Sequence, residues 1–137
     1  MITTKEIKSV EKAAAEAEKI TRAAVRALVE KRVDRGIKFL TKTVGKDWYK
    51  KINMSSLTLS SASSCITGQA FGHFETYLEK YPKEVPEDNG FDVIANDKDF
   101  YDTEFGEEVN EMFGNYDLLQ EVWLEKLKQI KKANRAK

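Results

Sequence analysis

The stretch NMSSLTLSSASSCITGQAFGHF, residues 53–74, contains no Asp, Glu, Lys or Arg, although charged residues make up 34% of this 137-residue chain. It also holds the only Cys, Cys65, and the only His, His73. Burying a charge without a partner is costly, so a segment free of charge is suited to run through the centre of a fold. We therefore expect residues 53–74 to form part of the core and to be the first place to look for a site.

The bulk composition predicts one globular domain over residues 1–137. The hydrophobic fraction of 41% is typical of a chain that builds its own core. A single Cys excludes an internal disulfide, which favours a cytoplasmic protein. The charged start of the chain predicts no signal peptide. The neutral stretch is long enough to cross a bilayer, but its Ser and Thr content is too polar for a membrane helix, so we expect no membrane contact.

The formal net charge of zero hides an uneven distribution along the chain. Residues 1–52 hold fourteen Lys and Arg against seven Asp and Glu, and residues 122–137 hold six basic residues against one Glu. Between them, residues 75–121 hold fifteen acidic residues against three Lys. These blocks either neutralise one another across the fold or between subunits, or they form separate basic and acidic faces, one of which meets a partner.

The first third of the chain predicts a long helix. Thr3 and Glu6 have the spacing of a capping box, and a run rich in Ala, Glu, Lys and Arg follows. An apolar seam with alternating steps of three and four residues runs along it, formed by Ile7, Val10, Ala14, Ala17, Thr21, Ala24 and Leu28. The seam packs either on its own domain or on a second copy, so residues 1–32 are a candidate oligomerisation helix. The apolar pattern continues to Val44, as a second helix or a bent continuation, and Gly45 ends it.

Further helical segments follow. Asp47 is placed to cap a short turn, and the serines at 60–64 offer N-caps for a helix from Cys65 to Tyr81 that ends at Pro82. Asp88-Asn89-Gly90 is a turn signal, and the acidic region around it is the least regular part of the chain.

Asp117 is expected to cap the last helix. Its apolar residues recur at helical spacing: Leu118, Leu119, Val122, Trp123, Leu127 and Ile130. The basic run from Lys126 to Lys132 lies near its C-terminus, where the helix macrodipole favours positive charge. The expected fold is therefore all-α: a small helical domain with a long N-terminal helix and an irregular acidic segment before the last helix.

Residue types that carry catalysis are sparse. On one helix, Cys65 and His73 are separated by about 12 Å of rise and cannot share a hydrogen bond. One Cys and one His fall short of a zinc ligand set, and the acidic residues at 96–104 lack the spacing of an EF-hand. We therefore expect no catalytic residue, no metal and no cofactor, and a protein that is not an enzyme.

Two polar residues of the neutral stretch are candidate ligand-binding residues. Gln69 and His73 lie one turn apart on the predicted helix, and both side chains can donate and accept hydrogen bonds. They either bind a polar, nucleotide-like small molecule or form a satisfied buried pair. Gly68 and Gly72 in the same helix would allow close helix packing, or the approach of a ligand to the backbone.

The acidic region offers candidate binding residues for a protein partner: Asp97, Asp99, Asp102 and Glu104. They are interleaved with aromatic residues, which favours a folded acidic surface that occupies a basic groove on another protein. Direct nucleic-acid binding is disfavoured, because the basic residues of the first helix are interspersed with Glu11, Glu16, Glu18 and Glu30.

Several motifs resemble those of a family of small, uncharacterised phage and prophage proteins. The matching residues are RGIKFL (35–40), Trp48, Ile52-Asn53, LTLS (57–60) and CITGQAFG (65–72), with looser matches at Gly90-Phe91 and Trp123. Ala62 stands where the family often has the first Cys of a Cys-x-x-Cys pair, so no paired-thiol redox or metal role is carried over. The resemblance implies a phage or mobile-element setting, where small accessory proteins commonly bind host machinery or signalling molecules.

The leading hypothesis is a non-catalytic phage-type accessory protein in the host cytoplasm, which binds and inhibits a host defence or regulatory protein through its acidic surface. The alternative is an oligomeric protein that binds or sequesters a nucleotide-like small molecule. Its pocket would lie at an oligomer interface or on the helix around Gly68 and His73.

Overall fold

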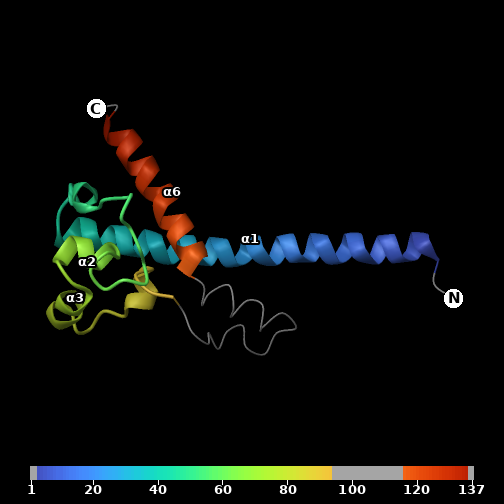
Figure 1. The fold of residues 1–137 in the computed structure, drawn as a ribbon, viewed down its shortest axis with the longest axis horizontal. Coiled ribbons are helices and arrows are strands. Elements are labelled where there is room, and N and C mark those ends of the chain that lie inside the picture. The colour runs from blue at the N-terminus through green and yellow to red at the C-terminus, as the bar shows by residue number, and fades with distance from the viewer. Residues whose placement is uncertain (1–2, 94–115, 136–137) are drawn as a thin grey trace.

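The computed structural model describes residues 3–93 and 116–135, and these residues form an all-α fold (Figure 1). The helices are α1 (Thr4–Thr43), α2 (Ile66–Phe71), α3 (Phe74–Lys80) and α6 (Tyr116–Arg135). Two 3₁₀ turns, η1 (Trp48–Lys51) and η2 (Pro86–Asn89), connect them, and no strand occurs among the described residues. The predicted all-α class, with a long N-terminal helix and a last helix, is confirmed.

Helix α1 is a continuous helix of 40 residues. Its predicted capping box is present: the Thr3 hydroxyl accepts a hydrogen bond from the Glu6 backbone N–H, and the Glu6 carboxylate accepts one from the Thr3 N–H, both at 3.2 Å. The helix runs without a break to Thr43. Gly45 then adopts a φ of +123°, which ends the helix as predicted, and its N–H donates to the Leu40 carbonyl.

Only the second half of α1 belongs to the core. Val25, Val29, Val33 and Leu40 are buried along one face, whereas the first half projects away from the body of the protein (Figure 1). In the projecting half, Ile7 is 47% exposed and Val10 is 69% exposed. Ala24 is also exposed.

The predicted seam therefore does not pack on its own domain at Ile7, Val10 or Ala24. Leu28, the last residue of the seam, is partly buried and packs against the core. The fully buried residues Val25 and Val29 each lie one residue after a seam position. One residue rotates the side chain by about 100° around the helix, so the core uses a neighbouring face.

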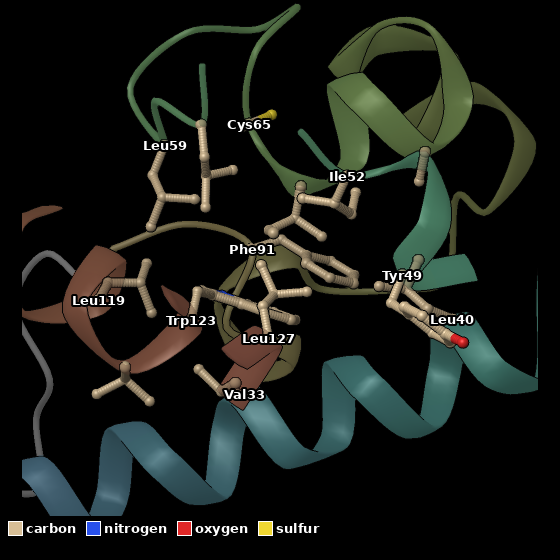
Figure 2. Close-up of a cluster of buried hydrophobic side chains, with 14 of the residues drawn as sticks. Val33, Leu40, Tyr49, Ile52, Leu59, Cys65, Phe91, Leu119, Trp123 and Leu127 are labelled. Atoms are coloured by element: carbon tan, nitrogen blue, oxygen red, sulfur yellow. The ribbon is translucent and has the colours of Figure 1, made fainter. Parts of the chain in front are cut away.

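The core lies where the second half of α1 meets η1, the neutral stretch and α6 (Figure 2). Trp123 of α6 is fully buried at its centre, with its ring stacked on Phe91 at 5.9 Å and edge-on to Trp48 at 6.3 Å. The predicted apolar face of α6 is confirmed by the burial of Leu119, Val122, Trp123 and Leu127. The neutral stretch contributes buried side chains as expected: Leu57, Leu59, Cys65, Ile66 and Ala70.

The predicted single helix from Cys65 to Tyr81 is wrong, because two short helices replace it. Gly72 has a φ of +94° and ends α2, and His73 returns to extended backbone and begins α3 as its N-cap. The Phe74 N–H then bonds the Ala62 carbonyl at 2.8 Å, which fixes the reversal to the preceding loop. Because Gly72 adopts a conformation that other residues rarely adopt, the helix cannot continue through it.

Two predicted caps also differ from the structure. Asp47 precedes η1 as predicted, but its side chain makes no capping hydrogen bond and instead lies 3.7 Å from the Lys50 ammonium. Helix α6 begins at Tyr116, so Asp117 lies inside the first turn. A carboxylate there still interacts favourably with the positive end of the helix dipole.

The backbone of α1 passes so close to η2 at Gly36 that adding a single methyl group there is expected to destabilise the fold. A Cβ atom at Gly36 of α1 would lie 2.1 Å from the Asn89 carbonyl oxygen and 3.1 Å from both Phe91 and Trp123. We expect Gly36→Ala to lower the free energy of unfolding by about 2–3 kcal/mol, the upper part of the usual range for overpacking. Urea denaturation of both proteins, monitored by circular dichroism, measures this difference in the free energy of unfolding.

The matched control is Ser9→Ala, in the projecting half of the same helix, where the side chain is exposed. This change is expected to alter stability by less than about 0.5 kcal/mol. Equal stability of Gly36→Ala and the wild type would contradict the close approach of α1 and η2.

Candidate functional site

Of the six predicted site residues, the structure describes only Gln69 and His73. Asp97, Asp99, Asp102 and Glu104 lie outside the described residues. The predicted placement of Gln69 and His73 one turn apart on one helix is wrong. Gln69 lies on α2, whereas His73 caps α3 on the other side of the reversal at Gly72. A ligand-binding role for any of these six residues stays a prediction.

The Gln69 amide ties two parts of the neutral stretch together. Its Oε1 accepts a hydrogen bond from the Asn53 N–H, and its Nε2 donates to the Ser64 carbonyl at 2.9 Å and to the Asn53 carbonyl at 3.3 Å. Both amide protons therefore have backbone partners. Gln69 thus joins the start of the stretch to the residue before Cys65.

His73 and Cys65 both act as helix caps. The Nδ1 atom of His73 accepts a hydrogen bond from the Glu75 N–H at 3.1 Å. The Sγ atom of Cys65 accepts one from the Gly68 N–H at 3.3 Å and lies 3.4 Å from the Thr67 hydroxyl. The thiol is free and buried. Each side chain satisfies a donor at a helix N-terminus, which is a structural role.

Gly68 is required by close packing. A Cβ atom there would lie 2.5 Å from the Ala62 carbonyl oxygen and 2.7 Å from the backbone of Ser63. The loop before α2 therefore lies directly against the helix. The space beside Gly68 is filled by loop backbone, whereas a Cβ atom at Gly72 would meet nothing within 4 Å, so the predicted close packing holds at Gly68, against a loop, and not at Gly72.

A small cavity lies between the neutral stretch and the start of α6. Its volume is about 130 Å³, and it is lined by Leu59, Ser60, Ser61, Ala62, Cys65, Phe74, Phe91, Asp92 and Tyr116. Ligand sites usually occupy about 300–1,000 Å³, so this cavity is small for a nucleotide-like molecule.

Tyr116 and Asp92 form the polar corner of this small cavity. The Tyr116 hydroxyl donates a hydrogen bond to Asp92 Oδ1 at 2.8 Å, and the same oxygen accepts one from the Val93 N–H. Burial and the neighbouring Asp92 carboxylate raise the pKa of Tyr116 to about 12. This bond joins the described parts of the chain on either side of residues 94–115.

A larger, basic cavity lies between η1 and the end of α6. Its volume is about 370 Å³, and it is lined by Tyr49, Lys50, Lys131, Asn134 and Arg135. Three of its five lining residues are cations, and none is acidic. The basic excess of residues 122–137 is a sequence signal for this cavity. In the sequence alone, that excess is explained by the favourable interaction of positive charge with the C-terminal end of a helix. Lys50 and Lys131 are also 81 residues apart, so only the fold shows that they share a cavity.

A third hollow, on the surface of α1, does not form an enclosed site. Its volume is about 760 Å³, and all its lining residues, Lys31, Asp34, Arg35, Ile37, Lys38, Thr41 and Lys42, belong to α1. A single helix cannot enclose a ligand. Asp34 also neutralises part of this surface through its ion pair with Lys126 at 3.1 Å.

Three further observations bear on the kind of site. Within residues 3–93 and 116–135, no group of three or more His, Cys, Asp and Glu is arranged to hold a metal ion. No helix of that same part of the chain is both long and apolar enough to span a membrane. Comparisons with protein-family models, with curated proteins and with solved structures find no match to this chain.

The Tyr116–Asp92 hydrogen bond predicts a specific dependence of stability on pH. The pKa of Tyr116 is raised from 10.0 to about 12, so the folded protein holds this proton more tightly than the unfolded chain. The resulting stabilisation is complete below pH 10 and is lost as the pH rises toward 12. Wild type is therefore expected to lose more stability over this interval than Tyr116→Phe, which has no proton to release.

Chemical denaturation of both proteins at several pH values measures the difference. The pKa of Tyr77 is also raised by burial, but Tyr77 is present in both proteins, so its contribution cancels. Parallel stability curves for the two proteins would contradict the assigned environment of Tyr116.

Proposed function

We propose that this chain is a non-catalytic, phage-type accessory protein of the host cytoplasm that binds and inhibits a host defence or regulatory protein. The contact surface is the acidic block, residues 92–115, with Asp97, Asp99, Asp102 and Glu104 as its central residues. The observation that carries the proposal is the hydrogen bond from Tyr116 to Asp92, because it anchors both flanks of this acidic block at one place on the fold.

The charge of the block supports an electrostatic mode of binding. Residues 92–115 hold eight acidic residues against one Lys. The flank before them is secured by Phe91, which is buried against Trp123, and the flank after them by Leu119. Negative charge accelerates association with a basic surface.

A non-catalytic role is supported by the use of the two residues with nucleophile or base chemistry. Cys65 and one ring nitrogen of His73 are occupied as helix caps, and they lie on either side of the Gly72 reversal. Nucleophilic catalysis requires such a pair to be within hydrogen-bond reach of one another.

The projecting half of α1 supports association with a second copy. Ile7 and Val10 are large apolar side chains that remain exposed, and they begin the predicted seam. Exposed apolar residues at heptad spacing are typical of helices that pair. We propose that two copies associate along this half of α1.

Reversing the charge of the acidic block tests the inhibitor proposal. The quadruple variant Asp97→Lys, Asp99→Lys, Asp102→Lys, Glu104→Lys is expected to lose partner capture from a bacterial lysate, because like charges then face the basic surface of the partner. Capture is measured by affinity purification followed by mass spectrometry. The control is Glu75→Lys, Glu79→Lys on α3, where both side chains are exposed. Equal capture by the quadruple variant and the wild type would overturn the proposal.

Light scattering tests the pairing of α1. Wild type is expected to have the mass of an oligomer, and Ile7→Glu, Val10→Glu the mass of one chain, because two charged residues then interrupt the seam. Ser9→Glu, at an exposed position between them, serves as the control. A wild-type protein with the mass of one chain at high concentration would exclude the pairing.

A further inference from the structure

The basic cavity between η1 and α6 has the composition of an anion site. Lys131, Asn134 and Arg135 come from the last turns of α6, and Tyr49 and Lys50 come from η1. The two elements are in contact, and Trp48 and Tyr49 of η1 are both buried. Figure 2 shows Tyr49 among the buried side chains of the core. The η1 wall of the cavity is therefore held by the hydrophobic core.

Two of its polar side chains are already oriented. The Lys131 ammonium donates to the Ile52 carbonyl at 3.1 Å, which uses one of its three N–H donors. The Asn134 amide donates to the Ile130 carbonyl at 2.8 Å, which uses one of two. The remaining donors are free to contact a ligand, and the loss of side-chain entropy on binding is reduced because these side chains are already held.

The charge of this cavity is weakly compensated. Within the described residues, Lys131 and Arg135 have no carboxylate partner, and Lys50 has only Asp47 at 3.7 Å. Both side chains of that pair are more than half exposed, at 66% and 57%, so the pair is weak. Arg26 shows the contrast, because its guanidinium contacts Glu30, Glu121 and Glu125.

The C-terminal end of α6 disfavours a bound anion, but the cations of the cavity outweigh this effect. The helix macrodipole places about half a negative charge at a C-terminus. Three cations line the cavity beside it. The balance is therefore positive, and the local field attracts an anionic ligand.

The size and the donors of the cavity define the class of ligand. A volume of about 370 Å³ falls in the usual range of small-molecule sites, about 300–1,000 Å³. Arg presents a planar fork of donors that matches phosphate oxygens, and Lys binds phosphate as a point charge. Tyr49 adds an aromatic wall, although only 8% of its surface is exposed.

We propose that this cavity binds a phosphate-bearing small molecule of about the size of a mononucleotide. The site would serve the alternative function, small-molecule binding, but it is formed by residues remote in sequence from the acidic block. Its test is therefore independent of host-protein capture, and either proposal can fail without the other.

Isothermal titration calorimetry of the full chain with inorganic phosphate, pyrophosphate and adenosine monophosphate tests whether the basic cavity binds phosphate. We expect saturable binding of at least one of these probes, with one site per chain. The variant Lys131→Gln, Arg135→Gln is expected to bind that probe about tenfold more weakly, because it removes two charge-assisted contacts. Tighter binding of adenosine monophosphate than of inorganic phosphate would identify a nucleotide, and the reverse order a simple phosphate; both support the site.

The matched control is Lys128→Gln, Lys132→Gln, which removes the same charge from exposed positions of the same helix outside the cavity. Because Lys131 also bonds the Ile52 carbonyl, Arg135→Gln alone serves as a second variant that leaves this bond in place. No saturable binding of any probe, or equal weakening in the control, would overturn the proposal, since equal weakening indicates a diffuse attraction to positive charge.

Discussion

The close crossing of α1 and the turn η2 is the constraint on which the rest of the structure depends. Gly36 leaves no room for a methyl group beneath the Asn89 carbonyl, and a Cβ atom at Gly90 would lie 2.9 Å from the Val33 nitrogen. The Trp123 indole N–H then donates to the Gly90 carbonyl, which joins α6 to the same point. This one contact orients Phe91 into the core and sets α6 across α1.

The uncharged stretch of residues 53–74 is used to build the fold. Cys65 and His73 cap the two helices that it forms, Gln69 closes its loop, and Gly68 admits the loop backbone. The thiol of Cys65, the amide of Gln69 and the Nδ1 atom of His73 therefore form hydrogen bonds with the backbone.

Much of the fold was predictable from local patterns, and the candidate sites were less so. The capping box at Thr3, the end of α1 at Gly45 and the buried face of α6 follow from signals within one or two helical turns. The reversal at Gly72 was missed because apolar spacing continued through it. The basic cavity was missed because Lys50 and Lys131 are far apart in sequence and meet only through η1 and α6.

Local sequence signals were sufficient to locate both ends of α1, since the capping box at Thr3 and the positive-φ Gly45 act on neighbouring residues. The absence of charge also predicted that residues 53–74 contribute to the core, which they do through Leu57, Leu59, Cys65, Ile66 and Ala70. Only the tertiary structure decided which face of α1 is covered. Val25 and Val29 are buried and Ala24 is not, because burial depends on where η2 and α6 lie. Helix periodicity identifies an apolar face, but the partner element decides whether that face is enclosed, as at Val25, or left projecting, as at Val10.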